Sequence, residues 1–437
     1  MPAPLAARLV RGSADAEALF LALFGGAPAA FWLDAGTDAS GGWSLLGAGR
    51  LEADPERVAA VSLTAAGDAD DGIPFRGGWV GWLDYESGAA TVGAPVAGSA
   101  QGTAWIAVDQ AIAIDHSTGS VWALAADDDL DDWHRRVVAA RDHGQPEPRP
   151  AASVSSARPR HGVDDYTALV QRCREAIRRG DAYQLCLTTR FTADAPDDPF
   201  EVYRRLRRAT PAHHGGFLRI ADRCLLSASP EQFLEVSGGM VRTSPIKGTR
   251  PRGATPEEDA RLAEELRASE KERAENVMIV DLMRNDLSHV GEPGSVLVER
   301  LWAVESYPAV HQLVSTVSAR LRAGVTFGEL CEAAFPAGSM TGAPKLSAMT
   351  ILHELEQAPR GVYSGCFGHV GLDGRVDLAM VIRSIVVADG EAFVGAGGGI
   401  TWLSDPHAEA AEVATKARAP LAALGASLPA SWAGLDG

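Results

Sequence analysis

Residues 256–289 of the chain, PEEDARLAEELRASEKERAENVMIVDLMRNDLSH, carry the pattern of a long helix. A proline stands at the start of the stretch and three acidic residues follow it, as is typical of a first helical turn. Leu, Ile and Met residues then recur at helical spacing. We predict one helix from about Pro256 to His289. Glu272 and Glu275, three positions apart, would share one face of it.

Other elements are predicted on both sides of this helix. Periodicity indicates further helices at 164–179 and 407–424, and strands at 183–192, 217–220, 224–227, 232–237, 365–371, 377–387 and 392–396. The elements are mixed, with neither a strict βαβ rhythm nor an internal repeat. This order favours an α/β fold in which helices pack outside large sheets.

The first third of the chain has a different residue pattern. Short β-like runs alternate there with glycine-rich turns, and seven of the ten tryptophans lie in it. We expect these large side chains to fill a core between sheets rather than to form an aromatic ligand pocket. A stretch rich in Pro, Ser, Ala and Arg follows. We therefore predict a β-rich N-terminal subdomain (1–148), a linker (149–162) and a second domain (163–430).

Composition excludes several classes of protein. A chain of 437 residues with 46% hydrophobic and 22% charged residues can bury a sizeable core. Its net charge of −17 argues against a nucleic-acid partner, which would require clustered basic surface. No apolar run approaches the roughly 18 residues that a membrane span needs. The five cysteines are scattered without a CxxC pair, which favours free thiols in a reducing cytoplasm.

Three tempting motifs fail on inspection. The run Gly395–Ile400 lacks the third glycine of a dinucleotide fingerprint, and Gly338–Lys345 has leucine where a phosphate loop needs Ser or Thr. The nucleophile motif Gly-x-Ser-x-Gly is absent from the sequence. Dehydrogenase, kinase and hydrolase functions therefore lose their main support.

Two helices each offer a pair of carboxylates. Glu272 and Glu275 share a face of the long helix, and Glu409, Glu412 and Lys416 share a face of the last one. Magnesium takes one or two protein carboxylates and completes its shell with water and ligand oxygens. Opposed glutamates from the two helices would suit it. On spacing alone, a solvated acidic surface is the alternative.

Other residues suit a small anion and its chemistry. The glycines after 392–396 leave backbone N–H groups uncovered, and Arg383 in an apolar strand could pair with a carboxylate. Lys247 lies between Pro245 and Gly248, where a neutral amine would be a nucleophile. Glu231 follows a turn, as a general acid would. Each of these has a structural alternative, an edge-strand arginine or a surface lysine among them.

Eight ordered motifs together resemble the chorismate-utilising enzymes. They are SASPEQF (227–233), SPIKGTRPRG (244–253), KERAENVMIVDLMRNDL (271–287), FPAGSMTGAPK (335–345), YSGCFGHVG (363–371), AMVIRS (379–384), VGAGGGI (394–400) and HAEAAEVATKARA (407–419). The resemblance covers about 163–424. The first third is similar only loosely, through AFWLD (30–34) and GGWVG (77–81), to the aminating members.

The resemblance implies a large fold of two packed β-sheets flanked by helices, and a magnesium-dependent site for chorismate. Carried over by motif, Glu275 and Glu412 would hold magnesium on the ring carboxylate. Glu272 and Glu409, one helical turn away, would lie behind these ligands or hold metal-bound waters. The groups that would hold the substrate carboxylates or lie near the ring are Arg383, Tyr363, Lys416, Thr341 and the amides of Gly397, Gly398 and Gly399.

Two positions indicate which branch of the family is most similar. Members that add water carry a lysine base where this chain has Gln184, so water activation would be disabled. Anthranilate synthases usually have alanine where this chain has Lys247, and lysine marks the aminodeoxychorismate synthases. In that branch Lys247 would attack C2 of the ring while Glu231 protonates the departing C4 hydroxyl. Ammonia would then enter at C4, and the product would supply 4-aminobenzoate for folate or for a specialised metabolite.

One departure concerns the step after amination. Many anthranilate synthases have histidine immediately before Leu-Val-Ser, whereas this chain has Gln312 there and His311 one position earlier. A shift of one residue on a strand reverses the face of the side chain. We hypothesise that losing that histidine keeps the enolpyruvyl arm on the product, and His311 stays a candidate site residue.

Ammonia needs a source outside the sequence given. No block with a cysteine nucleophile and its His and Glu partners is recognisable, so we predict a heterodimer with a separate glutamine amidotransferase subunit. Two alternatives stay open. One is an anthranilate synthase subunit, which Lys247 disfavours. The other is a non-catalytic protein that binds chorismate or tryptophan, which has no need for an acid and a nucleophile together.

Overall fold

The structure is a computed structural model and describes residues 2–12, 14–37, 39–64, 72–98, 102–141, 155–307 and 310–435. The first third of the chain forms β1 (Ala6–Val10), α1 (Ala16–Phe24), β2 (Ala29–Asp34), β3 (Trp43–Leu51), α2 (Glu56–Ala59), β4 (Gly78–Leu83), α3 (Tyr85–Thr91), β5 (Ala104–Asp115), β6 (Ser120–Ala125) and α4 (Leu130–Arg141).

The middle third contains more strands than either of the other thirds. It forms β7 (Ser155–Ser156), β8 (Arg158–Pro159), α5 (Val163–Arg179), β9 (Gln184–Asp194), α6 (Pro199–Ala209), β10 (His214–Ile220), β11 (Arg223–Ser229), β12 (Gln232–Ser237), β13 (Met240–Thr243), β14 (Ile246–Pro251), α7 (Pro256–Ala268), α8 (Glu270–Ser288), β15 (Leu297–Ser306) and β16 (Val310–Arg320).

The last third closes the fold. It forms α9 (Phe327–Ala334), a 3-10 turn (Gly338–Met340), β17 (Gly342–Ala343), α10 (Lys345–Glu356), β18 (Cys366–Gly371), β19 (Val376–Met380), β20 (Ser384–Ala388), β21 (Glu391–Ile400), α11 (Pro406–Leu424), β22 (Ala426–Ser427) and α12 (Ala430–Ala433).

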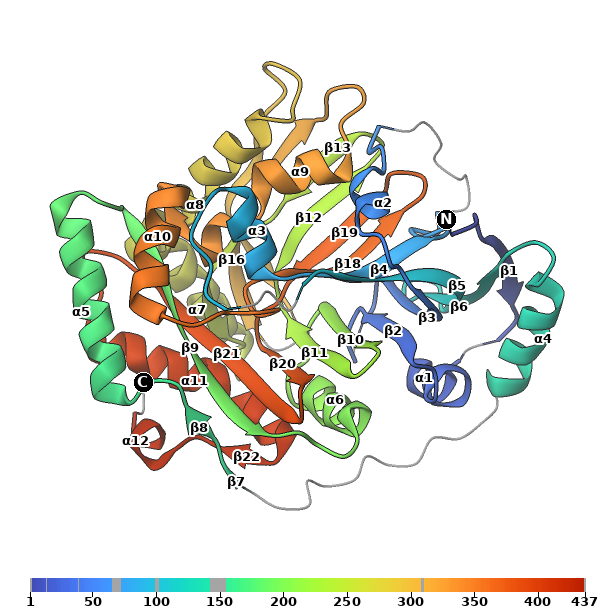
Figure 1. Ribbon diagram of the computed structural model, residues 1–437, viewed down its shortest axis with the longest axis horizontal. Helices are drawn as coiled ribbons and strands as arrows, with labels where there is room; N and C mark the ends of the chain where they lie inside the picture. The colour runs from blue at the N-terminus through green and yellow to red at the C-terminus, as the bar shows by residue number, and fades with distance from the viewer. Residues whose placement is uncertain are drawn as a thin grey trace.

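Twenty of the described strands hydrogen-bond into one continuous network, and β7 and β22 form a separate parallel pair (Figure 1). Strands from the first third pair directly with later ones: β2 runs antiparallel to β10, and β4 runs antiparallel to β18. The two ends of the sequence therefore share main-chain hydrogen bonds. The network is antiparallel throughout, and only the separate β7–β22 pair is parallel, so the structure matches the predicted α/β fold without βαβ units.

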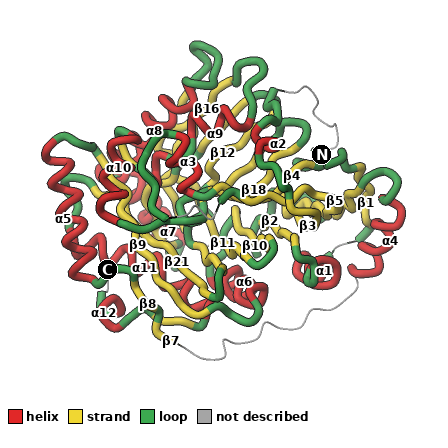
Figure 2. Tube along the Cα trace, viewed as in Figure 1, coloured by secondary structure: helices red, strands yellow, loops and turns green. Residues whose placement is uncertain are grey.

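The buried residues divide the strands into two layers. One core cluster, which includes Phe31, Trp82, Ile106 and Phe393, is built only from strands and their connections. Side chains on the opposite faces of the same strands form two further clusters, one with α1, α4, α5, α6, α10 and α11, the other with α2, α8 and α9. Figure 2 shows the helices outside and the strands between them. The expected pair of packed sheets flanked by helices is confirmed.

Five of the seven tryptophans of the first third fill these cores, as predicted, while Trp43 and Trp122 are only partly buried. Trp32, Trp79, Trp82, Trp105 and Trp133 each expose no more than 1% of their surface. Along β2, Ala30 and Trp32 face one cluster while Phe31 faces another, which is the alternation expected of a strand buried on both faces.

The predicted helix at 256–289 is wrong in one respect, because it is broken into α7 and α8. Ser269 leaves helical geometry at ψ 110°, ends α7, and accepts a hydrogen bond from the N–H of Glu272 to begin α8. Serine is a favoured N-cap because its hydroxyl satisfies an N–H left free in the first turn. The break starts a new helix immediately before the two glutamates.

The predicted strand at 377–387 is also wrong, since it is divided into β19 and β20. Arg383 adopts a φ of +51° between them, in the left-handed region that non-glycine residues rarely enter. By contrast, the glycine run predicted to follow a strand lies inside β21. The region 149–162 is described from residue 155, where β7 pairs with β22 and β8 pairs with β9.

Among the described helices, none combines the length and apolar character needed to cross a membrane.

Candidate functional site

A cavity of about 550 Å³ opens between α8, α11 and the strands β14 and β21. It brings together residues that are far apart in the sequence and were selected from it. Twelve of the predicted site residues line it: Glu231, Lys247, Glu272, Glu275, Tyr363, Arg383, Gly397, Gly398, Gly399, Glu409, Glu412 and Lys416. Gln184 and Thr341 lie outside the lining.

Gly248 positions the lysine strand against α8. Its φ is +77°, and the register of β14 against β16 shifts between Lys247 and Thr249. A Cβ built on Gly248 would lie 2.8 Å from the carboxyl carbon of Glu272. Only glycine therefore permits both the turn and this close approach. The ammonium of Lys247 has no hydrogen bond or ion pair with any described residue.

The four glutamates form two opposed pairs. Burial raises the pKa of Glu275, an effect that the nearby Lys247 and Lys271 reduce and that Glu272 and Glu412 reinforce. Burial likewise raises the pKa of Glu409. For Glu412 the ion pair with Lys416 outweighs burial, and its pKa is lowered. The carboxylates of α8 and α11 are thus close enough to repel one another.

This donor set fits magnesium. The described residues bring no three Asp, Glu, His or Cys groups close enough to enclose a metal ion by themselves. An ion here would take one carboxylate from each helix and complete its shell with water and ligand oxygens, which is the usual habit of magnesium. All four glutamates, Glu272, Glu275, Glu409 and Glu412, line the cavity from which such ligands would come. A cation would also favour the charged form of Glu275, against the burial and the smaller carboxylate repulsion that raise its pKa.

Cationic and aromatic groups form another part of the wall. Burial lowers the pKa of the Arg383 guanidinium, which the charge of Glu412 partly restores. The unusual backbone of Arg383 directs this side chain into the cavity rather than along a strand face. Tyr363 is 6% exposed, and its ring lies against Gly395, where a Cβ would be 2.2 Å from ring carbon Cγ. Gly395 was missed in the sequence because it stood inside a rejected motif.

Of the three glycine N–H groups expected to bind an anion, two are left free by the pairing of β21 with β9 and one is not. Gly397 and Gly399 stand opposite Thr188 and Cys186, whose N–H groups bond to Glu356 and to the carbonyl of Thr341. The two glycines are therefore in non-hydrogen-bonded pairs, and their N–H groups point away from β9. Gly398 lies opposite Leu187, so its N–H is used within the sheet. A Cβ on Gly398 would lie 2.6 Å from the Glu409 carboxylate.

Glu231 has the environment of an acid. It is 9% exposed, and burial raises its pKa to about 7 in spite of the opposing charge of Lys247. The hydroxyl of Ser339 donates to its Oε1 over 3.4 Å. Ser339 was not singled out in the sequence, because a serine in a turn gives no signal of which carboxylate it meets. A carboxyl with a pKa near neutrality can give or take a proton.

Two predicted residues do not line the cavity. Thr341 is fully buried, and its hydroxyl donates to the carbonyl of Ala337, so it turns away from the substrate space. Gln184 is 1% exposed, and neither its Oε1 nor its Nε2 has a hydrogen-bond partner among the described residues. Its Nε2 would lie 2.8 Å from a Cβ on Gly399, so it stands directly behind the glycine edge.

The residues before Leu313 divide between two faces, as the one-residue shift predicts. Gln312 lines the cavity. His311 points elsewhere: its Nδ1 lies 2.8 Å from the Ser306 hydroxyl and its Nε2 lies 2.9 Å from the Asp259 carboxylate. His311 therefore fastens α7 to β16 and takes no part in the cavity.

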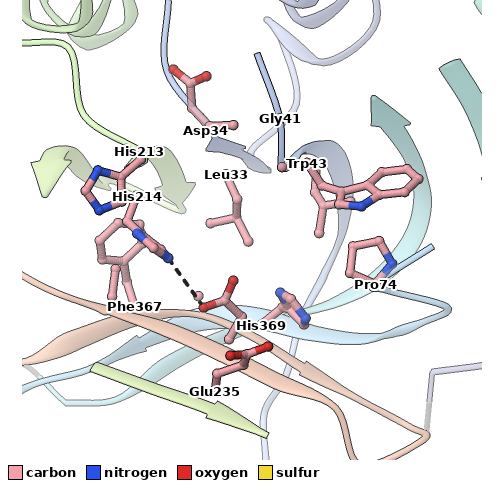
Figure 3. A pocket seen from close by; sticks show the side chains of 17 residues that line it. Leu33, Asp34, Gly41, Trp43, Pro74, His213, His214, Glu235, Phe367 and His369 are labelled. Atoms are coloured by element: carbon pink, nitrogen blue, oxygen red, sulfur yellow. Dashed lines mark ion pairs between the residues drawn. The ribbon is translucent and has the colours of Figure 1, made fainter. Parts of the chain in front are cut away.

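A second cavity, of about 390 Å³, lies between strands of the first third and later ones (Figure 3). Figure 3 shows His213, His214, Glu235, Trp43 and Asp34 around it. Burial lowers the pKa of each of the two neighbouring histidines to about 4, so both imidazoles are neutral at pH 7. None of the predicted site residues lines this space.

Comparison with known proteins shows which family and which relatives the chain is similar to. Residues 28–422 match the family model of the chorismate binding enzymes. The chain is 44% identical to an aminodeoxychorismate synthase of Streptomyces griseus over 81% of its residues, and it spans about half, 51%, of the length of that relative. It is 43% identical to anthranilate synthase component 1 of Streptomyces coelicolor, with 80% of this chain and 73% of that relative covered.

A solved structure has the same fold. Anthranilate synthase component I from Streptococcus pneumoniae superposes with a TM-score of 0.74 at 27% identity, over 95% of this chain and 92% of that one. The family match begins in β2 and ends in α11, so it includes both layers of strands and every wall of the larger cavity. The chain belongs to the family of chorismate binding enzymes.

Proposed function

We propose that the chain is the synthase component of an aminodeoxychorismate synthase, which converts chorismate and ammonia to 4-amino-4-deoxychorismate. One observation carries the proposal: the amine of Lys247 and the carboxyl of Glu231 line the same cavity as the four glutamates. A protein that only binds chorismate would need the anion-holding groups. It would not need a buried acid with a pKa of about 7 beside an unpaired amine.

Binding of the substrate dianion would use the cationic wall. Arg383 can form a bidentate pair with one carboxylate, and the N–H groups of Gly397 and Gly399 can donate to the other. Tyr363 and Lys416 border the same space. Glu275 and Glu412 would hold magnesium, with Glu272 and Glu409 behind them. When bound, the ion would neutralise the ring carboxylate among these glutamates.

The first half of the proposed reaction forms a covalent adduct. The neutral amine of Lys247 attacks C2 of the ring, the double bonds shift, and the bond from C4 to its hydroxyl breaks. Glu231 gives its proton to the departing hydroxyl, which leaves as water. The proton that the lysine nitrogen then loses returns to Glu231. Splitting one difficult displacement into two easier steps is the usual gain of nucleophilic catalysis.

The second half reverses the shift. Ammonia attacks C4, the double bonds return, and the bond between C2 and the lysine nitrogen breaks. The proton lost by the new amine passes to the released lysine, so chorismate and ammonia give the 4-amino product and water. The enolpyruvyl arm is untouched. Gln184, in place of a lysine base, leaves water without an activating group at this site.

Ammonia would come from a separate glutamine amidotransferase subunit bound as a heterodimer. The solved relative is itself called component I, which supports a multi-component arrangement. All five cysteines are free thiols, which supports a reducing, cytoplasmic setting. The product would serve 4-aminobenzoate and folate synthesis or a specialised pathway.

The product decides between this function and anthranilate synthesis. We would incubate the chain with chorismate, magnesium and excess ammonium at pH 8.5 and identify the product by mass spectrometry. Lys247→Ala is the test variant, and Lys271→Ala, at another lysine of the cavity lining, is the matched control. With ammonium omitted, the intact protein should gain the mass of chorismate less one water, and Lys247→Ala should gain nothing.

The expected product keeps the enolpyruvyl arm and disappears in Lys247→Ala but not in Lys271→Ala. Fluorescent anthranilate from the unmodified chain would overturn the proposal in favour of 2-amination. Binding of chorismate with no turnover, even with a glutaminase subunit added, would indicate the non-catalytic alternative.

A further inference from the structure

Lys416 is bound to two groups that the proposed function assigns to different ligands. Its ammonium donates to Oε1 of Glu412 over 2.6 Å and to the carbonyl of Gly397 over 2.8 Å. Glu412 belongs to the proposed metal site, and Gly397 borders the proposed anion site. The Lys416 side chain is 29% exposed and that of Glu412 is 48% exposed, so water reaches this ion pair from the carboxylate side.

The first of these contacts competes with a metal ion on the same carboxylate. An ammonium and a divalent cation that share one oxygen repel each other, and the ammonium occupies one of the lone pairs on which the ion would bind. Lysine has a flexible four-carbon stem, so it can leave Glu412 without moving the helix. Its short link to Gly397 would keep it inside the cavity, beside the N–H groups that face the substrate.

We infer that the Lys416 ammonium binds Glu412 while magnesium is absent. When magnesium binds Glu412, the ammonium stays near Gly397 and moves to a substrate carboxylate. The inference rests on the proposed function and deepens it, because it makes metal binding and anion binding depend on each other through one side chain. Such coupling is reciprocal: whatever magnesium gains from the anion, the anion gains from magnesium. Lys416 therefore opposes the metal when the cavity has no anion in it.

Lys271 provides the comparison. It also lies near the glutamates, with its ammonium 3.9 Å from Oε1 of Glu275, but its side chain is 69% exposed. Water and salt screen this pair more than they screen the Lys416 pair, because the Lys271 side chain is far more exposed. Among the described residues, Lys271 has no hydrogen bond to Gly397 or to the neighbouring glycines. Removing Lys271 changes the net charge as much as removing Lys416 does, without removing the proposed link.

The test measures binding without chemistry. Isothermal titration would give the Kd of magnesium and of 3-(carboxymethoxy)benzoate, a stable ring compound with two carboxylates, for the unmodified chain, Lys416→Met and Lys271→Met. In Lys416→Met we expect magnesium alone to bind about fivefold more tightly and the dicarboxylate about fivefold more weakly, the lower end of usual coupling between sites. In Lys271→Met both constants should change by less than about twofold.

Opposite signs for the two ligands are the signature, because a damaged fold would weaken both. Weaker or unchanged magnesium binding in Lys416→Met overturns the inference, as does an equal gain in Lys271→Met, which would make it a general effect of charge. Absence of magnesium binding to the unmodified chain would instead remove the metal from the proposed function. A product assay that shows anthranilate would leave the coupling measurement standing.

Discussion

The ring of Tyr363 rests on the main chain of Gly395, so closely that a Cβ on the glycine would lie 2.2 Å from ring carbon Cγ. The tyrosine is 6% exposed and lines the cavity, while the glycine belongs to β21. The position of the tyrosine side chain in the cavity therefore depends on a residue that has no side chain of its own.

Gly395→Ala should displace Tyr363 and destabilise the fold. Overpacking of this kind costs roughly 1–3 kcal/mol in the free energy of unfolding, because neither the strand nor the ring can move freely. We expect weaker binding of 3-(carboxymethoxy)benzoate together with a lower urea midpoint. Gly26→Ala is the control, since a Cβ there meets nothing within 4 Å. Equal midpoints for the two variants would contradict the contact.

The protonation of Glu231 should control the rate of the reaction near neutral pH. Its pKa is about 7, so the fraction that carries a proton to donate falls as pH rises through that value. We expect kcat/KM to decline above pH 7. Glu231→Gln should lose about 10²–10⁴ in rate below pH 7, and its deficit should shrink above pH 7 as the unmodified chain loses the same proton. A pH–rate profile of the variant that keeps the decline would assign it to another group.

The same carboxyl should make stability depend on pH. Because burial raises its pKa to about 7 from an ordinary 4.5, the folded chain binds more protons than the unfolded chain between these values. Stability therefore falls as pH rises through this window. Between pH 5 and pH 8 the unmodified chain should lose roughly 2 kcal/mol relative to Glu231→Gln. Urea unfolding at the two pH values measures the difference, and parallel losses in both chains would refute it.

Glu275→Gln should show whether magnesium stabilises the fold by binding at Glu275 or by a general effect of charge. The charged form of Glu275 is disfavoured by burial and by its carboxylate neighbours. With chelator present, the variant should melt at or slightly above the Tm of the unmodified chain. On addition of magnesium, the unmodified chain should gain stability by ligand linkage and the variant should not. The control is Glu332→Gln, at an exposed position of α9, which should keep the full magnesium shift.

Gln312→His should introduce a proton-transferring group into the cavity that Gln312 lines. If the enolpyruvyl arm is retained for lack of this histidine, the variant should release pyruvate, which a lactate dehydrogenase assay detects. Thr415→His, at another lining position, should release none. No pyruvate from Gln312→His would count against the hypothesis.

Helical spacing predicted much of the site from the sequence. The pairing of Glu272 with Glu275 and of Glu409 with Glu412 follows from a period that any helix obeys, and a break at Ser269 did not disturb it because both glutamates lie beyond it. Lys247, Glu231 and Arg383 were candidates from their local sequence, and the resemblance gave each of them a role. The cavity that brings them together arises from strand pairings between distant segments, which no local pattern contains.

The details that the sequence did not reveal depend on the backbone and on distant contacts. Arg383 has an apolar strand sequence around it, yet it takes a φ of +51° because the chain turns there to feed β20. Thr341 stands in a family motif, but its hydroxyl finds a partner in its own turn, at Ala337. Ser339 was missed for the opposite reason: its partner Glu231 is more than 100 positions away.

The pairings of β2 with β10 and of β4 with β18 bear on how the chain can be expressed and recombined. A fragment that began near residue 163 would expose the ladder edges of β10 and β18 as ready templates for aggregation. Its catalytic side chains would all be present, and it would still fail to stay monomeric. Chimaeras between relatives should therefore exchange the first third of the chain together with the remainder, since these two parts are joined by strand hydrogen bonds and not only by a flexible tether.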